Sequence, residues 1–155
     1  MAIETVSSAV CRQARIEDMA GCAAILNRWI DATPWMPRLY DHGDVGRHYR
    51  ETVFGEREVY ISEYDGAIAG FIALSADHHV TALYVDAGMR GKGCGKALLE
   101  LAKRNRPQGL QLWTFEANRN ARRFYARGGF SEIRRTDGDN EEGLPDVLME
   151  WRTSP

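Results

Sequence analysis

The chain has 155 residues, of which 44% are apolar and 27% charged. This balance is typical of a globular protein with one core, so we predict a single domain over residues 1–155. The 20 Lys and Arg side chains are offset by 22 Asp and Glu, which leaves a net charge of −2 at pH 7. No long-range positive field results, and we therefore expect neither nucleic acid nor an anionic membrane as a partner.

The three cysteines, Cys11, Cys22 and Cys94, form no CxxC pair, so we predict no zinc site, no other bound metal and no disulfide framework. A reduced, cytoplasmic protein is the simplest interpretation. The first residues, MAIETVSS, contain neither the basic nor the apolar part of a signal peptide. No apolar run approaches the roughly 18 residues that a membrane span requires.

The first third of the chain predicts a short strand followed by two helices. We expect the strand over residues 10–14 and a helix that begins at about Glu17. One face of this helix is apolar, with Met19, Ala23, Leu26 and Ile30 at helical spacing. Pro34 and Pro37 end it, and residues 33–40 form the connection TPWMPRLY. A second helix is expected over residues 44–54.

Three β-rich runs follow at residues 59–64, 68–75 and 79–85, and the Asp-Gly pair after the first run is a hairpin signal. Their close spacing predicts an antiparallel meander. After a glycine-rich segment we expect a helix from residue 97, a strand at 110–115, a helix at 118–127 and strands at 130–135 and 147–151. This order predicts an α+β fold, an α/β sandwich built on one sheet.

The glycine-rich segment GMRGKGCG, residues 88–95, lies between a predicted strand and a predicted helix. Glycines let the backbone turn sharply, and the free amides of the next helix can bind phosphate oxygens. The segment and its next residue supply Gly91, Gly93 and Gly95 together with Arg90, Lys92 and Lys96. A P-loop would need a hydroxyl where Ala97 stands, and a dinucleotide fingerprint would need glycine instead of Lys96. A glycine-rich helix cap is the plain alternative to an anion site.

Two motifs resemble those of the GNAT N-acetyltransferase superfamily. Arg90, Gly93 and Gly95 match its R-x-x-G-x-G pyrophosphate-binding motif, and EANRNARRFYARGGF is similar to N-x-x-A-x-x-(F/L)-Y-x-x-x-G-F. In the family, the helix of the second motif borders the pantetheine arm of coenzyme A. The resemblance implies an acetyl-CoA-dependent N-acetyltransferase of single-domain, bacterial type. It also implies a mixed, mostly antiparallel sheet of about six to seven strands flanked by about four helices.

The resemblance further implies which residues contact coenzyme A. They are Leu83, Tyr84, Val85, Arg90, Gly91, Lys92, Gly93, Cys94, Gly95, Lys96, Asn118, Ala121, Phe124 and Tyr125. The strand residues would act through their main chain, and one of their amides would polarise the acetyl carbonyl. Asn118 also fits a plain helix N-cap. Cys94 fits a small loop residue better than a nucleophile.

Three side chains are candidates for proton transfer. Tyr125 matches the family tyrosine that is usually assigned as general acid to the coenzyme A thiolate, although core packing alone would also explain it. His79 lies eleven residues before Arg90, where some members carry a glutamate base. An unperturbed histidine pKa near 6.5 suits that task, but a solvated histidine at a turn is as good an interpretation. Glu116 is the rival base, or else a solvated charge at a strand end.

In the family fold, the acceptor enters between the connection 33–40 and the loop that joins the last two strands. Trp35 and Tyr40 would supply an aromatic wall there. The loop TDGDNEEGLPD would attract a cationic amine through Asp137, Asp139, Glu141, Glu142 and Asp146, with Asp137 and Glu141 as the chosen candidates. Acidic loops are often merely solvated. A small-molecule amine and a peptide N-terminus are both kept as acceptors, and a homodimer is kept as an assembly.

Two interpretations from other classes stay open. The first is a coenzyme A-binding sensor or regulatory module without transferase activity, which would keep the glycine loop but would not need Tyr125. The second is an acetyltransferase that acts on charged tRNA, for which the basic segment ARRFYARGG is the only support. Its arginines are explained more simply as the solvent face of a helix.

Overall fold

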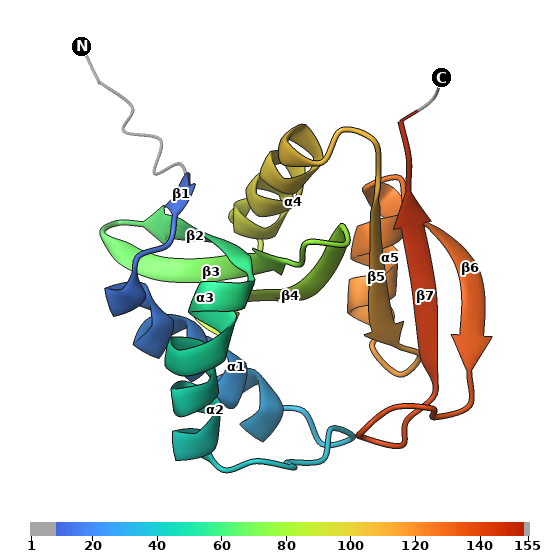
Figure 1. Cartoon of the computed structure of the whole chain (residues 1–155), viewed down its shortest axis with the longest axis horizontal. Helices are drawn as coiled ribbons and strands as arrows, with labels where there is room; N and C mark the ends of the chain where they lie inside the picture. Colours follow the sequence, from blue (N-terminus) through green and yellow to red (C-terminus); the bar gives the residue numbers. More distant parts are fainter. Residues whose placement is uncertain (1–8, 154–155) are drawn as a thin grey trace.

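The computed structural model describes residues 9–153. A seven-stranded sheet with the order β1-β2-β3-β4-β5-β7-β6 runs through the protein (Figure 1). The strands are β1 Val10–Gln13, β2 Glu58–Tyr64, β3 Ala67–Leu74, β4 His79–Val85, β5 Leu110–Phe115, β6 Ser131–Thr136 and β7 Asp146–Trp151. Only β4 and β5 pair in parallel. The mixed, mostly antiparallel sheet expected from the sequence is confirmed.

The helices are α1 Met19–Asp31, α2 His42–His48, α3 Phe54–Glu56, α4 Cys94–Asn105 and α5 Arg119–Arg127. Single 3₁₀ turns, η1 Ile16–Asp18 and η3 Ala87–Met89, precede α1 and α4. A π-turn, η2 Tyr49–Val53, joins α2 to α3, so the second predicted helix is one helical segment over 42–56. Asp41 is the N-cap of this segment, because its side chain accepts a hydrogen bond from the amide of Asp44.

The helices cover the sheet unevenly (Figure 1). The segments α1, α2 and η2 bury Met19, Cys22, Ile25, Val45 and Tyr49 against β2 and β3. On the opposite face, α4 and α5 pack against β3, β5 and β7. The open face of β5, β7 and β6 carries no helix among the described residues.

The buried face of α1 differs in part from the predicted one. Met19 and Ala23 are buried as expected, but Cys22 and Ile25 pack more deeply than Leu26 and Ile30. Leu26 and Ile30 are only partly buried. Near its C-terminal end, α1 borders a cavity beside β4 through Ile25 and Trp29.

The parallel contact between β4 and β5 is short and positions the site. These strands pair only at His79 with Gln111 and at Val80 with Leu112. Beyond that point they diverge, which leaves an opening in the middle of the sheet (Figure 1). The α1–α2 connection crosses below the opening and meets the β6–β7 loop, where the Tyr40 hydroxyl donates to Oε1 of Glu141.

Two further expectations concern metals and membranes. Within residues 9–153, no group of three or more His, Cys, Asp or Glu side chains is placed to hold a metal ion. In the same range, no helix has both the length and the apolar character to cross a bilayer.

Candidate active site

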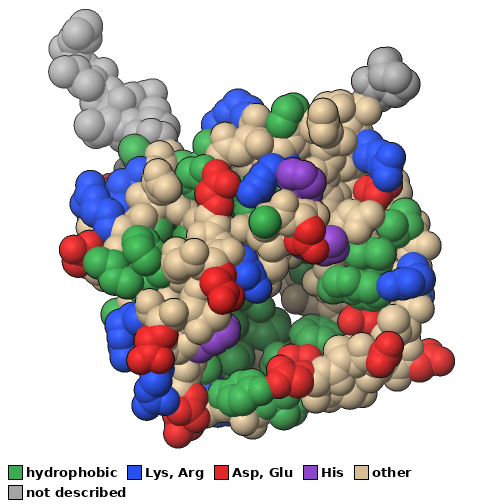
Figure 2. All heavy atoms as spheres, viewed as in Figure 1, with side chains coloured by type: hydrophobic (Ala, Val, Ile, Leu, Met, Phe, Trp, Pro, Cys, Tyr) green, Lys and Arg blue, Asp and Glu red, His purple; other side chains and the backbone are tan. Residues whose placement is uncertain are grey.

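A cavity of about 700 Å³ lies where β4 and β5 diverge. Figure 2 shows the hollow in the middle of this face, with hydrophobic side chains inside it. We call it the central cavity. The structure brings together nine of the residues predicted to contact coenzyme A along its walls: Leu83, Tyr84, Val85, Arg90, Gly95, Asn118, Ala121, Phe124 and Tyr125.

The glycine loop forms one end of the central cavity. Gly91 and Gly93 have φ angles of 77° and 82°, in the left-handed region that favours glycine. Gly93 is also the N-cap of α4, and the amides of residues 91–96 have no backbone acceptor in the described part of the chain. A run of free amides at a helix N-terminus is a site for phosphate oxygens. Arg90, Lys92 and Lys96 are exposed beside it.

Two positions in this loop show how closely a ligand can approach. A Cβ on Gly95 would come within 3.4 Å of Phe124 Cζ and of Val85 Cγ2, so a side chain there would fill space beside the cavity. Cys94 is only 1% exposed because it is the first residue of α4 and packs into the core. Its thiol therefore faces away from a ligand, and only its amide could serve coenzyme A.

The helix α5 forms the opposite wall. The Asn118 side chain accepts a hydrogen bond of 3.1 Å from the amide of Ala121, so it is the N-cap of α5. Asn118 also lines the central cavity. Tyr125 is 7% exposed and its ring centroid lies 5.3 Å from that of Phe124 and 5.6 Å from that of Phe130. Tyr125 thus belongs to the core and to the cavity wall at once.

Burial and the nearby Tyr84 raise the pKa of Tyr125 above its ordinary value. Burial is the larger cause, because the ionised phenolate would lose its hydration. The hydroxyl consequently keeps its proton at neutral pH. Burial, and next the charge of Glu142, likewise raise the pKa of Tyr84 to about 12.

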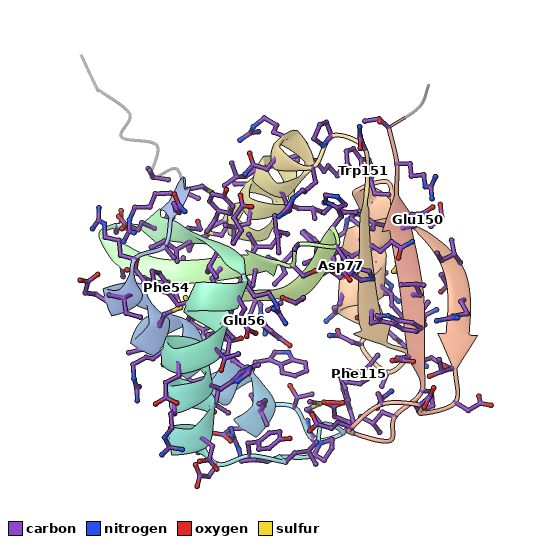
Figure 3. The ribbon with its side chains drawn as sticks, in the orientation of Figure 1. Phe54, Glu56, Asp77, Phe115, Glu150 and Trp151 are labelled. Atoms are coloured by element: carbon purple, nitrogen blue, oxygen red, sulfur yellow. The ribbon has the colours of Figure 1, made fainter. Side chains whose placement is uncertain are left out.

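A row of four aromatic rings spans the opening between β4 and β5. Ring centroids are 5.3 Å apart for Tyr84 and Trp29, 5.7 Å for Trp29 and Trp35, and 5.8 Å for Trp35 and Phe115. Figure 3 places Phe115 at the lower side of the opening. Trp35 was expected here, whereas Trp29, Phe115 and the side chain of Tyr84 were missed. The sequence does indicate the position of Trp29, since it stands four residues after Ile25 and therefore on the same face of α1.

An ion pair at the edge of the central cavity was also missed. The Arg28 guanidinium donates to both carboxylate oxygens of Asp86, with Nε–Oδ1 3.0 Å and Nη2–Oδ2 2.9 Å. Asp86 lies between β4 and the glycine loop. The pair therefore ties α1, on the aromatic side, to the segment that leads into the glycine loop.

The two base candidates do not line the central cavity. His79 Nδ1 lies 3.2 Å from the carbonyl oxygen of Asp77 and 3.4 Å from its carboxylate. Asp77 is at the upper side of the opening (Figure 3). Glu116 is exposed and its Oε1 lies 3.7 Å from Arg135. The structure thus does not bring either group together with Tyr125, and both assignments stay predictions.

The connection 33–40 and the β6–β7 loop meet, but only some of the residues predicted to bind the acceptor lie at the central cavity. Trp35 borders the central cavity, and Tyr40 contacts Glu141 across the two segments. Asp137 is exposed and is not among the residues that line the central cavity. Glu142, through its effect on Tyr84, carries a charge close to the central cavity.

A family model described as an acetyltransferase (GNAT) domain matches residues 44–153. The chain belongs to the GNAT acetyltransferase family. It is an acetyl-CoA-dependent N-acetyltransferase, since acetyl-CoA is the acetyl donor of this family. The match contains both motifs that were singled out in the sequence.

Named relatives agree with this placement. The chain is 30% identical to peptidyl-lysine N-acetyltransferase YjaB of Salmonella typhimurium over 146 residues, 89% of this chain and 93% of the relative. It is 26% identical to peptidyl-lysine N-acetyltransferase YiaC of Escherichia coli over 136 residues, 83% and 88% of the two chains. The solution structure of apo YjaB from E. coli superposes with a TM-score of 0.76 at 26% identity, covering 94% of this chain and 99% of that one.

Proposed function

We propose that this GNAT acetyltransferase acetylates a primary amine of a small molecule or peptide by direct attack, with Tyr125 as general acid. The observation that carries the proposal is the position of Tyr125. It stands in the wall of a cavity that has the glycine loop at one end and the aromatic row at the other. A donor and an acceptor that enter from these two ends would meet beside its hydroxyl.

The residues present fit the acetyl donor. The free amides of residues 91–96, with Arg90, Lys92 and Lys96, suit the pyrophosphate of coenzyme A. The diverging end of β4, residues 83–85, leaves main-chain groups without a partner in β5, which suits the amides of a pantetheine arm. When bound, acetyl-CoA supplies an activated thioester whose carbonyl carbon accepts the amine.

The chemistry asks three things of the chain. The amine must be neutral to attack, a donor must stabilise the carbonyl oxygen as it becomes negative, and the leaving sulfur needs a proton. The N–C bond forms while the C–S bond breaks. Tyr125 donates its proton to the sulfur, and the proton lost by the amine passes to a base or to water. Tyr125 can serve because its buried hydroxyl stays protonated.

A slender acceptor suits the entrance. Trp29 and Trp35 of the aromatic row line the central cavity, and an amine at the end of an aliphatic stem would pack on such an apolar wall. Both relatives are named as peptidyl-lysine N-acetyltransferases. A lysine side chain is such an amine, and it comes first among the acceptors that we would test.

The test is a panel of acceptors, with thiol release and product mass as readouts. The panel contains a lysine peptide blocked at its N-terminus, a lysine-free peptide with a free N-terminus, and Nα-acetyl-lysine methylamide. We expect thiol release to match a mass gain of one acetyl group on at least one acceptor. Tight acetyl-CoA binding without any transfer would contradict the proposal and favour a sensor.

A further inference from the structure

A second cavity, of about 410 Å³, lies on the helix-free face of β5, β7 and β6. We call it the side cavity. Its lining includes Trp113, Phe115, Arg134, Thr136, Asp139 and Glu142. Phe115 also contacts Trp35, which lines the central cavity, with ring centroids 5.8 Å apart. The two cavities are therefore neighbours, joined through this pair of aromatic rings.

The side cavity has an aromatic floor. Leu148 pairs in register with Trp113 on one side and with Arg134 on the other, so these three side chains project from the same face. The Arg134 guanidinium carbon lies 5.3 Å from the Trp113 ring centroid, and Trp113 is still 38% exposed. Figure 2 shows hydrophobic side chains gathered over these strands, beside the hollow. A large apolar surface on an uncovered sheet often marks a contact site.

The charges around this floor are not balanced. The side chains of Asp139 and Glu142 make no hydrogen bond or ion pair within residues 9–153. Asp146 accepts a hydrogen bond from the Thr136 hydroxyl and adds a third carboxylate. Arg134 is the one cation in the lining, and its guanidinium lies over Trp113. The cavity therefore favours a cationic guest with an aliphatic stem.

We propose that the side cavity binds a Lys or Arg side chain that flanks the acceptor lysine, so that the natural acceptor is a polypeptide. This inference rests on the proposed function, because it assumes that an amine enters the central cavity. An extended peptide that crosses Phe115 would place one side chain in each cavity. The stem of the flanking residue would pack on Trp113, and its charge would meet Glu142 and Asp139.

The experiment compares peptides that carry one acceptor lysine each. In one series a single Arg moves from three residues before the lysine to three residues after it, and in a matched series Gln takes its place. We expect kcat/KM for one Arg peptide to exceed that of its Gln counterpart by about tenfold, as for a close charge pair at an interface. Glu142→Gln should reduce this preference to about twofold. Glu51→Gln is the matched control, since Glu51 is exposed and lines neither cavity.

The small acceptor Nα-acetyl-lysine methylamide separates the possible failures. Glu51→Gln should acetylate it like wild type, and Glu142→Gln should lose much less activity toward it than toward the Arg peptide. An equal loss for peptide and small acceptor in Glu142→Gln would place Glu142 in the central site and overturn the inference. So would the absence of any Arg preference, or a preference that persists in Glu142→Gln and in Trp113→Ala. If no amine is acetylated at all, the proposed function fails and this inference fails with it.

Discussion

Tyr125 on α5 and Tyr84 on β4 line the same cavity, and the nearness of Tyr84 contributes to the raised pKa of Tyr125. The two phenols differ in their surroundings. Tyr125 packs among Phe124 and Phe130, whereas Tyr84 belongs to the aromatic row and feels the charge of Glu142. Each pKa is raised mainly by burial, so both hydroxyls are proton donors at neutral pH. Tyr125 follows Phe124, which lies next to Gly95 of the glycine loop, and for this reason we propose Tyr125 as the acid.

Substitution of Tyr125 by Phe should lower kcat by about 10² to 10³-fold, which is typical for the loss of a general acid. The Tyr125 hydroxyl makes no hydrogen bond within the described residues, so the change should leave the melting temperature nearly unchanged. Steady-state kinetics with saturating acetyl-CoA and a thermal melt provide the two readouts. Tyr49→Phe is the control, because it removes a buried hydroxyl outside the cavity. A kcat for Tyr125→Phe close to wild type would remove the assignment.

The raised pKa of Tyr125 has a consequence for the pH profile. An acid whose folded-state pKa lies above its ordinary value of about 10 stays protonated through the whole neutral and mildly alkaline range. We therefore expect no alkaline decline of kcat below about pH 10. Because the buried phenols ionise less readily when folded, they favour the fold below pH 10, and this contribution is lost as pH rises further. Circular dichroism at each pH separates unfolding from titration, and a decline near pH 8 that disappears in Tyr125→Phe would contradict this account.

The parts of the site that the sequence predicts are those that depend on local motifs. The glycine loop was found because Gly91 and Gly93 need left-handed backbone and α4 begins directly after them. Asn118 was found as a cap for a similar reason, since the capping bond spans only three residues. Both signals depend on neighbours along the chain.

The rest of the site depends on where β4 and β5 separate. The run HVTALYV predicts a strand, but nothing in its periodicity tells that its pairing with β5 ends after Val80. The space that opens there is filled by Trp29, Trp35 and Phe115, which come from three segments. The Arg28–Asp86 pair is likewise nonlocal, with its partners 58 positions apart in the sequence. Such contacts need the tertiary fold.

Substitution of Arg90 by Glu should weaken acetyl-CoA binding by about 100-fold, because a charge that attracts the pyrophosphate is replaced by one that repels it. Isothermal titration calorimetry at two salt concentrations measures the change, which should shrink at high salt. Arg47→Glu on α2 makes the same charge change away from the cavity and should bind normally. Equal affinities for wild type and Arg90→Glu would mean that the loop only caps α4.

Asp18 offers a test of the fold at the other end of the molecule. Its carboxylate accepts two hydrogen bonds from Arg12, at 2.8 and 3.0 Å, and one from the Arg15 amide at 2.7 Å. The Arg12 hydrogen bonds are the main cause of the lowered pKa of Asp18. A lowered carboxyl pKa stabilises the fold at neutral pH, and this stability is lost as pH falls below about 4.

Asp18→Asn should therefore lower the free energy of unfolding at pH 7 by about 2 kcal/mol, since a largely buried charged acceptor is lost. The difference from wild type should shrink as the pH falls below about 4 and the Asp18 carboxylate takes up a proton. Urea unfolding at pH 7 and at low pH gives both values. Asp44→Asn, which affects an exposed pair with Arg47, should cost less than about 0.5 kcal/mol. A pH-independent difference for Asp18→Asn would assign the loss to packing instead of charge.

Trp35→Ala should weaken the binding of the acceptor amine and leave the binding of acetyl-CoA unchanged. Trp35 joins Trp29 to Phe115 across the opening, so its removal breaks the aromatic row without touching the glycine loop. If the acceptor stem packs on the Trp35 ring, the loss of one such aromatic contact, worth up to about 1.5 kcal/mol, predicts roughly a tenfold rise in KM for the acceptor. The affinity for acetyl-CoA, measured by calorimetry, should stay within about twofold of wild type. If acetyl-CoA affinity instead fell as far as acceptor affinity, the aromatic row would belong to the donor side, and the amine would have to enter elsewhere.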